Sequence, residues 1–108
     1  ENSNGYIKKI DVKNSEIGLA IKDSSSITVN KLNLHNVKLA GAIFNKKKQF
    51  GSSKLIIQDI EKNYDFKDFL IGEKNKLIIH KDYFDGNLKN SVVKKKLYGN
   101  EFGTKTVR

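Results

Sequence analysis

Short apolar runs recur in the same order along this chain, separated by polar turns, and they fall into two series. The runs of the first series end at Ile21, Ile43 and Ile71, and those of the second end at Val29, Ile57 and Ile79. The spacings are 22 and then 28 residues in the first series, and 28 and then 22 in the second. Because both series cover 50 residues, they share one frame. A repeat of this size built from very short strands predicts a solenoid.

Each predicted coil carries about three short strands, with residues that favour turns between them. The first coil is expected to hold strands at residues 10–12, 19–21 and 27–29, the second at 32–34, 41–43 and 55–57, and the third at 69–71 and 77–79 after a weak start at Ile60. Small residues at Gly18, Ala20 and 40–42 predict a narrow corner. Asn14 and Asn36 lie 22 residues apart in equivalent turns. They form either a ladder along the stack or two ordinary turns.

The second coil is longer than the first, and the extra length lies between Ile43 and Ile57. An insertion in a solenoid must leave the stack as a loop on one face, where binding residues are often found. Cations beside aromatic rings suit acidic sugars or nucleic acid. The alternative is a lysine-rich loop whose phenylalanines pack on the solenoid wall. The candidate binding residues of this loop are Phe44, Lys46, Lys47, Lys48, Gln49 and Phe50.

The repeat ends near Gly86, and residues 87–108 are predicted to form a basic C-terminal cap and tail. Helical spacing of apolar residues predicts a short helix that begins at Asn87 or Asn90. The apolar stripe of this helix is expected to cover the open end of the last coil, because terminal coils need caps. The residues at this spacing are Leu88, Val92, Val93 and Leu97.

The formal net charge is +9, and residues 87–108 carry a disproportionate share of it. Such a balance favours anionic partners, among them acidic polysaccharide, phosphate polymers and anionic lipid. Solubility alone explains the charge equally well. Arg108 is the only arginine, which argues against specific nucleic-acid recognition. No run approaches 18 apolar residues, so no membrane span is predicted.

The residue types that carry catalysis or bind metals are few or badly placed. The chain has no cysteine, which excludes disulfides and thiolate metal sites. His35 and His80 occupy different positions of the repeat and predict no metal pair. A column of Asp11, Asn33 and Glu61 faces outward but is chemically mixed, and two pairs of acids three residues apart, Asp65 with Asp68 and Asp82 with Asp85, suit turns as well as acid–base chemistry. No catalytic residue, metal or cofactor is predicted.

Residues 17–29 read Ile-Gly-Leu-Ala-Ile-Lys-Asp-Ser-Ser-Ser-Ile-Thr-Val. This stretch resembles one turn of a right-handed parallel β-helix of the pectate-lyase-like or periplasmic copper-repeat-like kind. The resemblance covers residues 6–86 and implies a fold rather than a function, since such proteins include lyases, hydrolases, epimerases, adhesins and phage spikes. Residues 44–47, 68–72 and 97–103 are similar to the β-helix region downstream of spore-coat-H-like kinase modules. That likeness implies that any kinase chemistry lies upstream, outside this chain.

The predicted fold is therefore all-β, a right-handed parallel β-helix of about three coils over residues 1–86, with a short C-terminal helical cap. We expect a non-catalytic terminal segment of an extracellular or cell-envelope protein, with a structural or carbohydrate-contacting role. Its expected partners are upstream coils of the same protein or another chain, and acidic polysaccharide. The alternative is the C-terminal part of a polysaccharide-active enzyme, a lyase, hydrolase or epimerase, with catalytic coils upstream. Both expectations make the chain the end of a longer solenoid; a processed mature protein is the competing interpretation.

Overall fold

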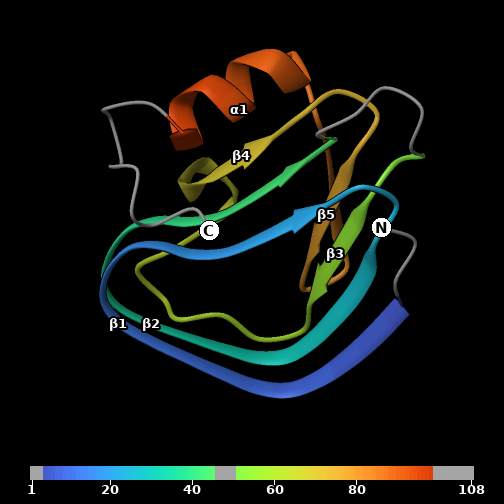
Figure 1. Cartoon of the computed structure of the whole chain (residues 1–108). Coiled ribbons are helices and arrows are strands. Elements are labelled where there is room, and N and C mark those ends of the chain that lie inside the picture. The colour runs from blue at the N-terminus through green and yellow to red at the C-terminus, as the bar shows by residue number, and fades with distance from the viewer. Residues whose placement is uncertain (1–3, 46–50, 99–108) are drawn as a thin grey trace.

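The protein folds into a β-solenoid of about three turns with one short C-terminal helix. The computed structural model describes residues 4–45 and 51–98. Figure 1 shows the coils nearly end on, with β1 and β2 each running around most of a turn. In chain order the elements are β1 (Asn4–Lys22), β2 (Ser26–Phe44), β3 (Lys54–Ile57), the 3-10 helix η1 (Phe66–Asp68), β4 (Phe69–Ile71), β5 (Lys76–Ile79), β6 (Asp82–Asp85) and α1 (Asn90–Tyr98).

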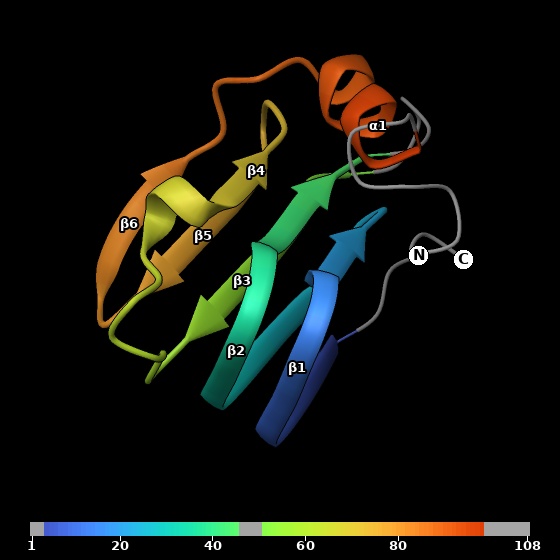
Figure 2. The ribbon, with the colours of Figure 1, turned by 90° about the vertical axis from the view of Figure 1, so that its left-hand side faces the viewer.

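The strands stack in the frame that the sequence predicts. β1 pairs in parallel with β2 at a constant offset of 22 residues, from Asn4 opposite Ser26 to Lys22 opposite Phe44. β2 pairs in parallel with β3 and β4 at an offset of 28, and β3 pairs in parallel with β5 at an offset of 22. Figure 2 shows the strands side by side from β1 to β6. The predicted solenoid and its two series of apolar runs are confirmed.

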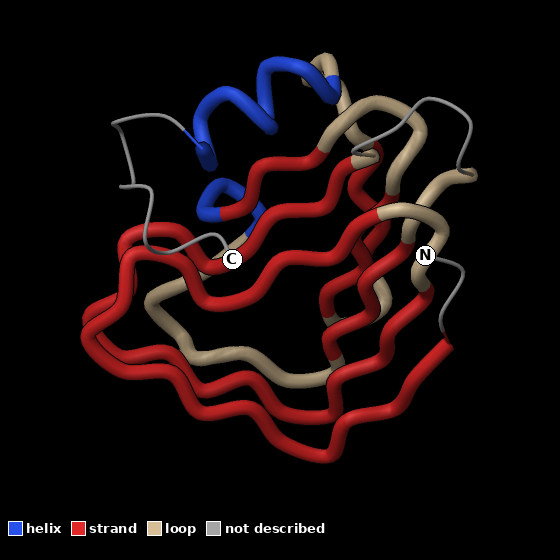
Figure 3. The backbone as a smooth tube through the Cα atoms, in the orientation of Figure 1, coloured by secondary structure: helices blue, strands red, loops and turns tan. Residues whose placement is uncertain are grey.

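Each long strand turns a corner without leaving its ladder. Asn14 in β1 and Asn36 in β2 have φ angles of 53° and 56°, the left-handed region that asparagine tolerates. Nδ2 of Asn36 donates to Oδ1 of Asn14 at 2.9 Å, so these residues form the predicted ladder. The strands predicted as separate on either side of this corner are therefore continuous (Figure 3). The first strand also begins at Asn4, earlier than the sequence indicates.

The solenoid has three sides around one core. The first side consists of the beginnings of β1 and β2 with β3, β5 and β6, and the third consists of the ends of β1 and β2 with β4. The second side lies between them, where Leu32 bridges Ile60. The hydroxyl of Tyr64 donates to the carbonyl of Val37 and accepts from its N–H, both at 3.0 Å, which fixes the loop of the last coil. The buried residues of the core include Ile21, Val29, Leu32, Leu34, Ile43, Leu55, Ile57, Ile71 and Leu77.

Small residues on the third side lie where neighbouring coils come close together, while the narrow corner that they predict stays a prediction. A Cβ atom on Gly18 would clash with the carbonyl oxygen of Ala40 in the next coil. One on Gly41 would lie 2.8 Å from the ring of Phe69. Both glycines therefore allow a close approach between neighbouring coils.

The last coil is closed by an antiparallel strand. β6 pairs antiparallel with β5, after a turn through His80 and Lys81, whose φ angles are 49° and 75°. Phe84 of β6 packs against the core, and its ring stacks on that of Phe66 in η1, with 4.5 Å between ring centroids. Residues 82–85 lie in the stretch predicted as parallel coils. That part of the prediction is wrong, because the tight turn reverses the chain.

The helix α1 covers the outer face of the third side rather than the end of the stack. Val93 and Leu97 are fully buried in a cluster with Leu39, Ala42 and Phe44. This cluster is separate from the core, and Figure 1 shows α1 outside the coil beside β4. The prediction that the helix covers the open end of the last coil is wrong. The helix lies on the third side because the end of β2 is apolar on both faces, and its outer face must be shielded from water.

Two asparagines fasten the start of α1 to the solenoid. Oδ1 of Asn90 accepts the backbone N–H of Asn45 at 2.9 Å and Nδ2 of Asn75 at 3.2 Å. Oδ1 of the buried Asn75 accepts the N–H of Ser53 at 2.6 Å. Asn90, one of the two predicted starts, is where the helix begins. Leu88, predicted inside the helix, instead bridges the last coil.

Candidate functional site

Most of the loop predicted to bind a ligand lies outside the described residues. These are Lys46, Lys47, Lys48, Gln49 and Phe50, whose role stays a prediction. Phe44 is described, and its side chain is only 1% exposed in the cluster with Val93 and Leu97. For Phe44 the structure supports the alternative, packing on the solenoid wall. Its ring is covered by α1 and offers no face to a sugar.

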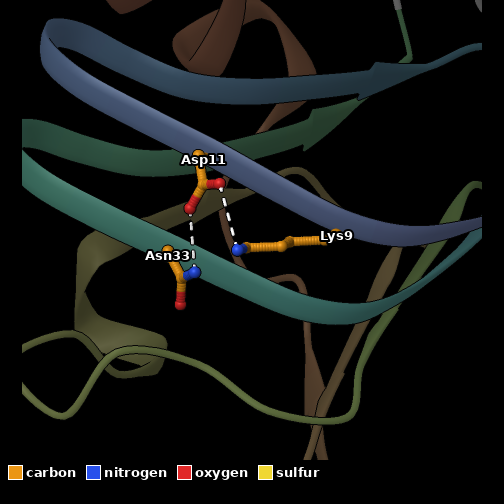
Figure 4. Close-up of polar contacts among 3 residues, drawn as sticks. All are labelled: Lys9, Asp11 and Asn33. Atoms are coloured by element: carbon orange, nitrogen blue, oxygen red, sulfur yellow. Dashed lines mark hydrogen bonds and ion pairs between the residues drawn. The ribbon is translucent and has the colours of Figure 1, made fainter.

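The outer surface of the second side carries part of the predicted polar column (Figure 4). Nδ2 of Asn33 donates to Oδ1 of Asp11 at 2.8 Å, and Nζ of Lys9 lies 3.5 Å from Oδ2 of Asp11. The hydrogen bond from Asn33, aided by the charge of Lys9, holds the pKa of Asp11 below its ordinary value. The carboxyl group therefore stays ionised near neutral pH and is a poor general acid.

A small open cavity of about 240 Å³ lies beside this column. Its lining includes Asp11, Asn33, His35, Glu61 and Tyr64, and it contains no serine, threonine or cysteine. The Tyr64 hydroxyl is already engaged by the backbone of Val37. The cavity offers acceptors and amide donors for hydrogen bonds, and its lining lacks the hydroxyl or thiol of a nucleophile of the Ser, Thr or Cys type.

The two predicted carboxylate pairs lie in exposed segments near the end of the stack. Oδ1 of Asp65 accepts the N–H of Lys67, and Oδ2 of Asp68 accepts the N–H of Asp65, both at 2.9 Å. These reciprocal bonds form a capping box at the start of η1. Asp82 and Asp85 are exposed at the two ends of β6. The structure thus supports the interpretation of the first pair as turn acids.

The two histidines lie on different parts of the solenoid. His35 lines the cavity of the second side, whereas His80 lies in the turn between β5 and β6. Within residues 4–45 and 51–98, no group of three or more His, Cys, Asp or Glu side chains could hold a metal ion. No helix of the described chain is long and apolar enough to cross a membrane.

The outer face of the first side carries a row of residues that the sequence analysis did not single out. From β1 to β6 the strand register aligns Tyr6, Thr28, Ile56, Ile78 and Tyr83. These side chains point outward, because their strand neighbours Leu55 and Leu77 are buried in the core. Tyr6 is 64% exposed and Tyr83 is 70% exposed, one at each edge of the row. We call this row the tyrosine face.

A groove of about 520 Å³ lies on the half of the tyrosine face nearer β6. Ile56, Ile78 and Tyr83 line it, together with the polar side chains of Gln58, His80 and Lys81. Most of the surface that lines the groove is apolar, and its polar side chains can donate hydrogen bonds. This combination is typical of a site that orients a ligand by a few polar contacts.

Two further lysines stand beside the tyrosine face. Lys54 and Lys76 are exposed and lie opposite each other on β3 and β5. Neither they nor Lys81 form an ion pair with any residue that the structure describes. Asp85 is in register with Lys76 and offsets part of this charge. The face remains positive on balance.

The tyrosine face has only a weak signal in the sequence. Tyr6 and Tyr83 are 77 residues apart, and the second reaches the face through an antiparallel turn. The repeat frame does place Thr28, Ile56 and Ile78 in one column, since these residues are 28 and 22 apart. The frame was therefore a usable signal for the middle of the row, but not for its two aromatic ends.

No protein-family model, no curated protein and no solved structure matches this chain. The likeness to pectate-lyase-like coils and to spore-coat-H-like proteins therefore stays a prediction, and the solenoid architecture is what the structure supports.

Proposed function

We propose that this chain is a non-catalytic β-solenoid segment that contacts acidic polysaccharide through the tyrosine face. The observation that carries the proposal is the arrangement of two exposed tyrosines at the edges of an apolar row, beside lysines that form no ion pair within the described residues. The proposal moves the predicted contact surface from the loop at residues 44–50 to the first side of the solenoid. It retains the predicted class of ligand.

The dimensions of the face suit an extended chain of sugars. Tyr6 and Tyr83 are separated by four strand spacings, which amounts to about 19 Å. Between them, Thr28, Ile56 and Ile78 lie in register on neighbouring strands, and an extended polymer could contact them in succession. Aromatic side chains contribute large, rigid and amphipathic contact surfaces, suited to the apolar faces of sugar rings.

The charges beside the face favour an acidic polymer over a neutral one. Lys54, Lys76 and Lys81 place three cations near the row, against Asp85 as the acid in register with them. Exposed lysines that lack ionic partners attract a polyanion at little desolvation cost. Carboxylate groups spaced along a polysaccharide would meet these ammonium groups while the sugar rings lie on the tyrosines.

Nucleic acid is a poorer fit to the same surface. Binding of single strands relies on successive bases stacked on neighbouring aromatic rings. On the tyrosine face the two rings are separated by the aliphatic floor, so adjacent bases could not both stack. The right-handed winding that the resemblance to pectate-lyase-like coils implies is retained in this proposal, and it agrees with the right-handed preference of parallel β crossovers. The extracellular or envelope location stays a prediction.

Binding to defined polymers tests the proposal directly. We would measure dissociation constants by isothermal titration calorimetry for polygalacturonate and for neutral dextran of matched length. We expect binding to polygalacturonate that weakens with added salt, because salt screens exposed charges. Tyr83→Ala and the double variant Lys54→Gln/Lys76→Gln should each weaken it about tenfold.

The matched control is Lys13→Gln/Lys67→Gln, which removes the same charge away from the tyrosine face and should bind as the parent does. The proposal fails if neither polymer binds, or if dextran binds as tightly as polygalacturonate. It also fails if single-stranded DNA or polyglutamate binds equally well and the tyrosine variant keeps full affinity. That last pattern would mean attraction by charge alone.

A further inference from the structure

We infer that the open edge of β1 is a docking surface for a further parallel β-coil, one that presents an amide or carboxylate oxygen at the corner occupied by Asn14. The coil would belong to another solenoid segment rather than to a second copy of this chain. This inference concerns a different surface from the tyrosine face and does not depend on polysaccharide binding.

The two ends of the stack are finished differently. At one end β6 pairs antiparallel with β5, and the stacked rings of Phe84 and Phe66 close the last coil. At the other end β1 is the outermost strand, and within residues 4–45 and 51–98 it pairs with β2 alone. An edge of this length presents many unpaired backbone groups, and natural sheets normally shorten, bend away or cover such edges. β1 is one continuous strand of 19 residues that runs alongside β2.

The core is also incomplete at this edge. Ile10 and Val12 of β1 point into the solenoid but are only partly buried, while their register partners Leu32 and Leu34 in β2 are buried. The difference arises because β2 has a coil on both sides and β1 has one on a single side. A further coil in the same frame would bury the inward residues of β1 as β1 buries those of β2.

The asparagine ladder specifies what the next coil must offer. Nδ2 of Asn36 donates to Oδ1 of Asn14, which leaves the Nδ2 group of Asn14 as the next donor of the ladder. Within the described residues this group has no acceptor. A stacked coil would complete the series with an oxygen-bearing side chain at the same corner. Asn14 already holds the left-handed backbone that such a corner requires.

A second copy of this chain is a poor occupant of the same edge. β1 carries four lysines and two acids, and the whole chain has a formal charge of +9. Two copies related by a twofold axis would also meet with antiparallel β1 strands, whereas every pairing of β1 and β2 is parallel. A coil with neutral or acidic edge residues would meet Lys9 and Lys13 without repulsion.

A coil of known compatibility can serve as the probe. Residues 4–25 form one 22-residue unit, because Asn4 pairs with Ser26. We would insert before Asn4 a second copy of residues 4–25 that carries Lys9→Asn and Lys13→Asn, so that its edge is neutral opposite Lys9 and Lys13, and follow amide hydrogen exchange in the native β1. Alternate amides of β1 point away from β2, and these should gain protection of at least about tenfold once a coil is stacked on them. The denaturation midpoint should rise as well.

The matched control is an inserted copy that lacks Asn14, which shifts half of the copy out of register and reverses which of its side chains face inward. It should give no protection. Protection equal to that of the full copy, or no protection with the full copy, would overturn the inference.

The unmodified chain provides a second arm that does not depend on the folding of the inserted coil. Sedimentation velocity should show a monomer, and exchange should show fast outward amides in β1. A dimer in which those amides are protected would overturn the choice of partner in favour of a second copy.

Discussion

The open and the closed ends of this solenoid differ in how the edge of the sheet is covered. At the closed end the chain reverses after β5, and the Phe66 and Phe84 rings stack over the last coil. At the open end, no further strand among the described residues pairs with the outward backbone groups of β1, and Ile10 is packed from one side only. The difference shows that the contribution of a residue to the free energy of unfolding depends on its position in the repeat and also on the number of coils next to it.

The largest expected contrast is between two residues in the same position of successive coils. Leu32→Ala should lower the free energy of unfolding by about 3 kcal/mol, since Leu32 is fully buried between two coils. Ile10→Ala, one coil earlier, should cost only about 1 kcal/mol, because its side chain has a coil on one side. Urea denaturation of both variants measures the difference. Equal losses would contradict the idea that the β1 edge is incompletely packed.

A smaller contrast is expected between aromatic residues at the two ends. Phe66→Ala removes the ring that stacks on Phe84 and should destabilise the protein by about 1 kcal/mol. Tyr6→Ala, at the open end, should change the free energy of unfolding by less than about 0.5 kcal/mol, because its ring is mostly exposed. Thermal unfolding at matched protein concentration separates the two. A larger loss at Tyr6 would reveal a partner on the open end.

The smallest effect is expected at the polar column of the open coil. Asn33 and Lys9 lower the pKa of Asp11 in the folded protein, so the ionised carboxylate favours the folded state. This contribution is present above the ordinary Asp pKa of about 3.9 and is lost as the pH falls through the lowered value. Asp11→Asn should therefore be slightly less stable than the parent at pH 7, and the two should converge in acid. Melting temperatures from pH 7 to pH 2 measure this, and a gap that widens in acid would contradict it.

The part of the fold that depends on repetition could be predicted from sequence. The spacings between Ile21, Ile43 and Ile71 give the parallel register directly, because stacked coils must align their inward residues. The ladder of Asn14 and Asn36 follows from the same frame. Such features repeat, so each copy reinforces the interpretation of the others.

The parts that occur once were predicted poorly. β6 has no repeat partner, and its direction depends on two left-handed residues, His80 and Lys81, that no periodicity reveals. The position of α1 depends on an outward apolar face at the end of β2. The run of apolar and small residues at 39–44 carried that signal, because a strand buried on both faces loses its polar alternation.

The candidate site could be predicted only in part for the same reason. The frame aligns Thr28, Ile56 and Ile78, but the two tyrosines reach the face from the first and the last strand. Phe44, chosen from the sequence for its place beside the lysines, faces the helix instead. Local composition identified the type of residue, whereas the register decides which residues share a face.

The direction of the hydrogen bonds has a mechanical consequence. In the ladders from β1 to β5 the bonds run along the stacking direction, while the covalent chain winds around it. A pulling force applied to Asn4 along the stacking direction therefore breaks the hydrogen bonds between β1 and β2 one after another, starting at Asn4. A load across the stack is carried by the polypeptide itself. A coil seated on β1 would move the first interface to open under such a load away from β1 and β2.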